Sequence, residues 1–442
     1  MLIILICLIL IIAFLIAFFI SDEFAIGSLI LSFPFEKTSW YLGFFTLKPT
    51  IILIILLYLK IIFKALKVYK IKSKNIKFIF INLISMIIIN IISSVMAVNP
   101  LKSFSRIIQN LTLYGLLFSF CLLNYNKIKI EKLINYYLLS GIIILAYGYF
   151  QIIGYYLGID TYSLLSKFNN PNFYYGTWVV EINGNVFPRM NSFFGDPSML
   201  CGFLTIICMF ILYKIINEKK YVFLLYLLFS VIALGFTFSR SGWIGFIFML
   251  MVYSLFNIKK HIKEISIGIL LCLTLIVVMQ NSGVIKLDVL LNRMNQTFDS
   301  TNISTSGHEN FAKLAIQGFK TSPIIGIGLG NFSDFVEEYG MTHSMYLSLI
   351  CETGILGTLL FFNIIKKLLM DGIKLKSSIQ SVVPCVYSII GFLVSNIAYD
   401  YSNQYYFWGV LAMLLYIENM YDKKDCVSQH ISVHIKKLDK ST

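Results

Sequence analysis

Long apolar runs separated by short polar connections dominate the sequence. A helix that crosses a membrane needs about 20 apolar residues, and the pattern predicts about twelve such spans. They cover residues 2–20, 41–63, 78–98, 106–124, 133–158, 197–216, 221–238, 242–257, 265–280, 343–365, 379–399 and 405–421. The pattern is weakest over 21–49, where charged residues and prolines interrupt it, so a re-entrant or interfacial piece is a second interpretation there. The run at 2–20 has no preceding basic residue and no small-residue cleavage pattern after it, which predicts a span and not a signal peptide.

The composition agrees with this pattern. The chain has 442 residues, 58% of them hydrophobic and 13% charged, whereas globular domains average about 45 to 50% apolar and about 25% charged residues. This excludes ordinary soluble domains, a disordered chain, a coiled coil and a soluble nucleic-acid binder. We predict an all-α polytopic membrane protein in which residues 1–442 form a single integral membrane domain.

The net charge of +14 is interpreted first as a sign of membrane topology. Lysines cluster in every second connection, and the positive-inside rule places these connections and both chain ends in the cytoplasm. The clusters occupy residues 60–77, 127–132, 214–220, 259–263 and 366–376 and the predicted cytoplasmic tail 422–442. Two long connections, 159–196 and 281–342, then lie outside. The second is the predicted extracytoplasmic loop, and its segment 308–320 has the spacing of an amphipathic helix lying on the membrane surface.

Arginine follows the opposite rule from lysine. The chain has four arginines, Arg106, Arg189, Arg240 and Arg293, and all of them are predicted at or beyond the outer face. A guanidinium is permanently charged, planar and suited to bidentate phosphate binding. A headgroup anchor is the simpler interpretation for Arg106 and Arg293. Arg189 and Arg240 lie in polar, turn-rich segments between apolar runs, which favours a binding role for them.

Helix ends point to the same level of the membrane. The spans predicted to begin near 106, 197, 242 and 343 all run inward, so their N-termini and unpaired backbone N–H groups face outward. Asp196 followed by Pro197 is a good helix start, with Asp as N-cap and Pro at the first helical position. Several arginines and helix N-termini at one level predict a site for a large, membrane-held anion such as a lipid pyrophosphate.

Other chemistry is disfavoured. The outer acidic residues show no metal-ligand spacing, and the eight cysteines form no CxxC or Cys/His cluster, so neither a metal site nor disulfides are expected. Gly326, Gly328 and Gly330 follow a proline outside any βαβ context, which predicts a tight turn and not a nucleotide loop. Glu352 is interpreted as a buried structural carboxylate.

Three stretches together resemble the O-antigen ligase and Wzy-type polymerase family of bacterial membrane glycosyltransferases of the GT-C class. They are FPRMNSFFGDPS at 187–198, TFSRSGW at 237–243, and GIGLGNF at 326–332 followed by HSMY at 343–346 and ETGILG at 352–357. Their order and common side of the membrane make the set more specific than any single motif. Ser344 departs from the pattern, because many relatives carry Asn after the histidine.

The resemblance implies a GT-C-like fold and metal-independent, inverting glycosyl transfer without a cofactor. By matching position, Arg189 and Arg240 would bind the donor diphosphate, and His343 would act as base toward the acceptor hydroxyl. Further candidates for contacts with diphosphate or glycan are Arg106, Arg293, Asp196, Ser239, Asn331 and Tyr346. Neighbouring arginines are expected to keep His343 deprotonated.

The expected function is that of a polysaccharide polymerase in lipopolysaccharide-type biosynthesis. It would move a growing glycan from undecaprenyl diphosphate to a lipid-linked repeat unit at the outer face of the bacterial inner membrane. A ligase or O-oligosaccharyltransferase that hands the glycan to lipid A core or protein shares this chemistry. A transporter or flippase would carry ionisable residues near the midplane and related halves, and neither is evident. A purely structural membrane protein is the remaining alternative. The expected partners are the lipid-linked donor and acceptor and the bilayer, with a chain-length regulator as a candidate and no nucleic acid.

Overall fold

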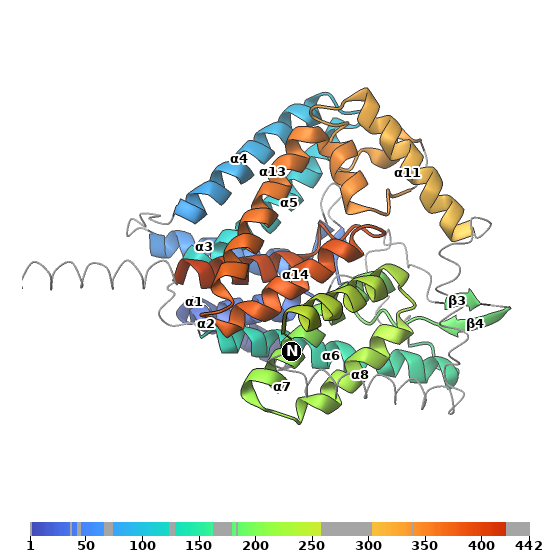
Figure 1. Cartoon of the computed structure of the whole chain (residues 1–442). Helices are drawn as coiled ribbons and strands as arrows, with labels where there is room; N and C mark the ends of the chain where they lie inside the picture. The colour runs from blue at the N-terminus through green and yellow to red at the C-terminus, as the bar shows by residue number, and fades with distance from the viewer. Residues whose placement is uncertain are drawn as a thin grey trace, which may run out of the picture.

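The computed structural model describes residues 2–35, 38–41, 46–65, 74–122, 129–161, 179–182, 184–257, 303–337 and 340–420. Its helices in chain order are α1 (Leu2–Ile20), α2 (Asp22–Ser32), α3 (Pro49–Ala65), α4 (Lys74–Val95), α5 (Pro100–Leu122), α6 (Ile130–Tyr156), α7 (Pro197–Glu218), α8 (Phe223–Phe236), 240–257, α11 (Ile303–Thr321), α12 (Phe332–Phe335), α13 (Met345–Leu375), the short 3-10 helix η3 (Gln380–Val382), α14 (Val383–Ser395) and 405–420. Two antiparallel hairpins, β1 (Trp40–Tyr41) with β2 (Thr46–Leu47) and β3 (Val179–Ile182) with β4 (Asn185–Pro188), complete the described elements (Figure 1).

The mostly helical prediction is confirmed. Each predicted span has a helix in its place, except 265–280, which lies outside the described residues. Within the described part, α4, α6, α7 and α13 are each long and apolar enough to cross a membrane, and the bent pair α1–α2 would make a fifth. The count of about twelve spans, the GT-C-like fold and the boundaries of the outer loop and tail stay predictions. The expectation of helices alone was wrong in one respect, because the two hairpins are strands.

The region 21–49, where the apolar pattern is weakest, begins with a sharp bend. The axes of α1 and α2 differ by 118° across the break at Ser21. Lys60 of α3 is buried there, and its ammonium donates to the carbonyls of Phe18 and Ser21 at 2.6 and 2.7 Å and pairs with Asp22 at 2.9 Å. The buried cation therefore satisfies the carbonyl of Phe18 near the end of α1 and adds a second bond to that of Ser21, which also accepts from the N–H of Ala25.

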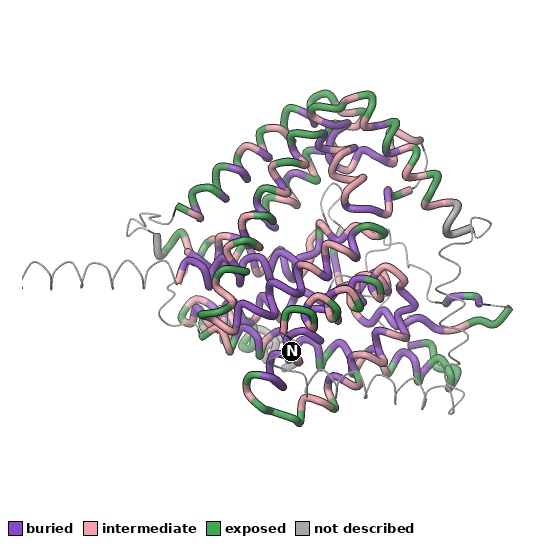
Figure 2. The backbone as a smooth tube through the Cα atoms, viewed as in Figure 1, coloured by how far each residue is buried: buried purple, intermediate pink, exposed green. Residues whose placement is uncertain are grey.

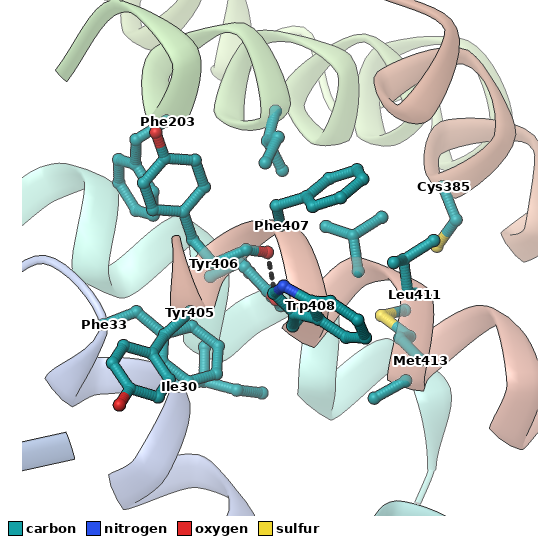
Figure 3. Packing of buried hydrophobic residues seen from close by; sticks show 14 of the residues in the cluster. Ile30, Phe33, Phe203, Cys385, Tyr405, Tyr406, Phe407, Trp408, Leu411 and Met413 are labelled. Carbon is teal, nitrogen blue, oxygen red and sulfur yellow. Dashed lines mark hydrogen bonds between the residues drawn. The ribbon is translucent and has the colours of Figure 1, made fainter. Parts of the chain in front are cut away.

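The centre of the bundle is α7 together with the helix 405–420. In α7, 89% of the most apolar window is buried, against 39% in α4. Figure 3 shows how Tyr406, Phe407 and Trp408 fill the space between α7, α2 and α14. Phe407 stacks on Phe392 with ring centroids 4.4 Å apart and ring planes 4° apart. The burial map places this core low in the molecule, and the outer faces of α4 and α11 are partly exposed (Figure 2).

The turn that contains Gly326, Gly328 and Gly330 packs against a break in α13. Gly354 has φ 63° and ψ −170°, which interrupts the helix. Ile327 and Gly328 donate their N–H groups to the carbonyls of Cys351 and Glu352, at 3.0 and 3.1 Å. On the other side of the break, the N–H groups of Ile355 and Leu356 donate to the carbonyls of Pro323 and Ile324, at 2.9 and 3.2 Å. The turn therefore pairs with the backbone groups that the break exposes, as buried backbone requires.

This pairing explains why glycines are needed on both sides. A Cβ on Gly326 would lie 2.3 Å from the carbonyl carbon of Glu352, and one on Gly354 would lie 2.4 Å from that of Ile324. The Glu352 carboxylate accepts a 2.9 Å bond from the N–H of Gly330. The predicted tight turn is thus confirmed, and the bond from Gly330 agrees with the structural role predicted for Glu352, although this residue is half-buried and not fully buried.

Candidate functional site

An open cavity of about 540 Å³ brings together residues from five separate segments of the chain, within 189–198, 238–244, 308–312, 342–347 and 397–399. Its lining includes Arg189, Asp196, Ser198, Ser239, Arg240, Ser241, His308, Glu309, Thr342, His343, Ser344 and Tyr399. The walls come from the end of β4, the starts of α7 and of the helix 240–257, the start of α11, the approach to α13 and the loop after α14. In Figure 1, α11 slopes toward the β3–β4 hairpin on the same side of the molecule.

Three helices begin at this cavity. Asp196 caps α7, and its carboxylate accepts a 2.7 Å bond from the N–H of Ser198, with Pro197 in the first turn as predicted. Arg240 and Ser241 are the first residues of the helix 240–257, and Ser344 is the N-cap of α13. The positive ends of three helix dipoles therefore face one space, which favours a bound anion.

Arg189 is held by the β3–β4 hairpin and by the end of α8. It follows Pro188, the last residue of β4, and Val180, Ile182 and Phe238 form a small apolar cluster under the hairpin. The Nε of Arg189 donates to the carbonyl of Thr237 at 2.9 Å, and the side chain is buried. One N–H of the guanidinium is thus fixed to the protein, and the group is held in the cavity wall.

Arg240 lies on the same wall. Burial, together with the nearby guanidinium of Arg189, lowers the pKa of Arg240. The two guanidinium groups repel each other, so an anion bound by both removes an unfavourable interaction as well as adding favourable ones. Gly242 permits the helix to approach α7, because a Cβ there would lie 2.2 Å from the Sγ of Cys201. Ser239, beside Arg240, is buried, and its hydroxyl lies 3.4 Å from that of Ser241.

His343 lines the same cavity and lies just before the N-cap of α13. Its φ is 52°, in the left-handed region that few non-glycine residues adopt. Burial lowers the pKa of His343, and Asp196 partly opposes this shift. The imidazole is therefore disposed to be neutral, as expected, but the cause differs from the expectation, because burial and not the arginines accounts for the shift.

Three predicted contact residues do not line the cavity, and each bonds to another protein group instead. Arg106 belongs to the second turn of α5, which begins at Pro100 and not near 106, and its Nη1 donates to Gln109 at 3.0 Å. Asn331 is fully buried and donates to the Ser103 hydroxyl at 2.7 Å. The Tyr346 hydroxyl donates to the carbonyl of Leu393 at 2.8 Å. Arg293 lies outside the described residues.

Sequence reasoning missed the contribution of α11 and of the loop after α14. His308 and Glu309 line the cavity, and the His308 ring lies 4.1 Å from that of His343, centroid to centroid. Tyr399, from the loop after α14, also lines it. The helical spacing of 308–320 predicted a surface helix, and α11 confirms the helix, but nothing in that spacing indicated where it would pack. Among the residues that the structure describes, no group of three His, Cys, Asp or Glu side chains could hold a metal ion.

The fold and the cavity define a helical integral-membrane protein with a cationic, imidazole-containing pocket. Residues 223–362 match the family model for O-antigen ligase, so the resemblance carried by the sequence motifs is confirmed over that segment. The match includes Arg240, the α13 kink and His343. It begins at residue 223 and therefore does not include Arg189. No curated protein matches the chain.

Proposed function

We propose that this protein is a metal-independent, inverting glycosyltransferase of the membrane. It would move a growing glycan from undecaprenyl diphosphate to the non-reducing end of a lipid-linked repeat unit. The observation that carries the proposal is the convergence of Arg189, Arg240 and His343 on one cavity, although 154 positions separate the first from the last (343 − 189).

The arginines suit the donor. A glycosyl diphosphate contains its own leaving group, so the transition state needs cations where negative charge develops. Arg189 and Arg240 would bind the diphosphate oxygens, and the three helix N-termini would add to this field. Asp196 and Ser239 line the same cavity and would contact the diphosphate or the sugar next to it. We also propose that Arg293 or Arg106 would contact the part of the glycan chain that extends beyond the cavity.

His343 suits the acceptor. In the proposed step the acceptor hydroxyl attacks the anomeric carbon, the bond from that carbon to the diphosphate oxygen breaks, and the lipid diphosphate leaves with the electron pair. The neutral imidazole of His343 takes the hydroxyl proton, which requires a base that is deprotonated near neutral pH. A buried histidine with a lowered pKa meets that requirement.

A ligase that transfers the finished glycan to lipid A core or protein is the second candidate, because the family match carries that name. Both reactions use the same donor chemistry and differ in the acceptor. Incubation of the purified protein with one lipid-linked repeat unit separates them. A ladder of longer lipid-linked products supports the polymerase, and transfer only after a second acceptor is added supports the ligase instead.

In the proposed orientation, the cavity opens toward the cell exterior. Ala398 lines it and is exposed, so a cysteine introduced there provides a label for sidedness. We expect Ala398→Cys to react with a membrane-impermeant maleimide added outside intact spheroplasts. Reaction only after the cytosolic face is opened would contradict the proposed orientation and with it the use of an externally presented lipid-linked glycan.

A further inference from the structure

A second histidine lies against the proposed base. The rings of His308 and His343 are 4.1 Å apart, centroid to centroid, and their planes differ by 32°. Phe311, one turn further along α11, also contacts His343, at 6.1 Å and 48°. One face of α11 therefore brackets the His343 imidazole with two rings.

The backbone of His343 leaves its side chain in need of such support. His343 precedes the N-cap of α13, so no helical turn restricts its rotamer, and its left-handed φ of 52° is a strained conformation. Phe311 is itself anchored, since it packs against Phe332 in the apolar cluster between α11 and α13. The contact thus links the proposed base to the apolar cluster between α11 and α13.

We propose that His308 is a positioning residue for His343, and that α11 forms a wall of the acceptor half of the cavity through His308 and Glu309. This inference rests on the proposed function. His308 acts through ring contact: it covers one face of the His343 imidazole and holds it in the orientation that receives the acceptor proton. The role proposed for His308 is contact between the two rings, and direct proton transfer between them is not part of the proposal.

The electrostatic surroundings define what should change when His308 is removed. The charged or titratable groups that line the cavity around His343 are His308 and Glu309 from α11, Asp196 at α7, Arg189 after β4, Arg240 on the helix 240–257 and Tyr399 after α14. Removing the His308 ring exposes His343 to water and reduces the burial that disfavours its cationic form. The pKa of His343 should then rise toward its ordinary value of 6.5.

The first test reads the base itself and needs no turnover. The chain has five histidines, and replacing His261, His430 and His434 by Gln leaves His308 and His343 for NMR titration of isotope-labelled histidine in detergent micelles. His308→Phe keeps a ring against His343, whereas His308→Ala removes it. We expect the pKa of His343 to stay lowered in the Phe variant and to rise in the Ala variant. An unchanged His343 titration in the Ala variant would overturn the proposal.

The second test measures glycan transfer. His308→Ala should lower kcat about 10- to 100-fold with little change in the KM for the donor, and should move the acid limb of the pH profile upward, whereas His308→Phe should keep most of kcat and the acid limb. Gln317→Ala, an exposed position on the same helix, is the matched control and should behave as wild type.

A His308→Phe variant as slow as the His308→Ala variant would show that the imidazole itself is required, which contradicts a positioning role. If the wild-type protein transfers no glycan in the same assay, the proposed function fails, whereas the NMR comparison of the His308 variants is unaffected by that result.

Discussion

Two regions of this protein each contain several residues with left-handed backbone, and the residue types differ between the two. At the α13 kink and its turn, all four such residues are glycines: Gly326, Gly328, Gly330 and Gly354. Around the cavity they are Ser192, Phe238 and His343, none of which is glycine. Phe238 and His343 line the cavity, and Ser192 lies three positions after Arg189.

This difference separates a structural region from a candidate functional one. Where only backbone geometry matters, as at the kink, glycine adopts the conformation without strain. At the cavity a side chain occupies the position despite a cost of about 1 to 2 kcal/mol for each left-handed non-glycine residue. Strain that is retained where a side chain is needed is typical of functional sites. The geometry of His343 therefore supports its proposed role independently of the sequence motif.

The largest expected effect is the loss of the base. His343→Ala removes the proton acceptor, and general base catalysis contributes about 10² to 10⁴ in rate. We expect kcat for glycan transfer to fall by that factor while donor binding is retained, measured as donor affinity and turnover in the same detergent preparation. An extension rate near that of wild type would exclude His343 as the base.

Loss of one arginine should have a somewhat smaller effect. A hydrogen bond to a charged group contributes about 1.5 to 3 kcal/mol, so Arg240→Ala should lower kcat/KM about 10- to 100-fold or more. Arg240→Lys keeps the positive charge but loses the planar guanidinium that can donate two parallel hydrogen bonds. Its kcat/KM should lie between those of wild type and the Ala variant. If the Lys variant is as active as wild type, charge alone suffices and the bidentate interpretation is wrong.

The kink is tested by adding a methyl group where only glycine fits. Gly326→Ala combines a left-handed φ with a Cβ 2.3 Å from the Glu352 backbone, and should cost about 2 to 4 kcal/mol of stability. Gly184→Ala has a similar φ but nothing within 4 Å of its Cβ, and should cost only about 1 kcal/mol. Thermal unfolding in detergent compares them. Equal melting temperatures for the two variants would show that the turn does not pack into the kink.

Much of the fold was predictable, because a run of apolar residues long enough to cross a membrane specifies a helix with little ambiguity. The residues at which the helices begin and end were harder to predict. The span near 106 was predicted too late because Lys102, Ser103 and Arg106 are polar, whereas α5 begins at Pro100, with Asn99 accepting from the N–H of Lys102. A proline after an Asn is a helix-start signal that a hydropathy reading overlooks.

The site was predictable where motif and helix-end reasoning met, as for Arg189, Asp196, Ser239, Arg240 and His343, all of which line the cavity. It was not predictable where tertiary packing decides. The direction in which α11 folds, and hence the contact of His308 with His343, depends on the cluster around Phe311 and Phe332. Asn331 does not line the cavity, because an outer polar residue can bond to a buried part of the protein as well as to a ligand.

A modest effect on the pH profile follows from the burial of His343. Its pKa lies below 6.5 in the folded protein, and the base must be neutral to act. Activity should therefore persist as pH falls to 6.5 and be lost only as pH falls further, through the lowered pKa. The pH dependence of kcat/KM measures this limb. An acid limb at or above 6.5 would mean that His343 is not buried in the active form.

The smallest effect concerns strain far from the cavity. Lys219, the C-cap of α7, has φ 56° and is exposed, and it lies about 33 Å from Asp196 at the other end of this 22-residue helix. Lys219→Gly relieves the strain at a position where glycine is favoured and should add about 0.5 to 1 kcal/mol of stability. Glycan transfer should not change, because no group at the cavity moves. Lys219→Ala keeps the strain and is the matched control, so a gain in melting temperature shared by both variants would come from losing the lysine and not from the backbone. Strain that can be removed without cost at Lys219, but not at His343, would complete the distinction between the two kinds of left-handed residue.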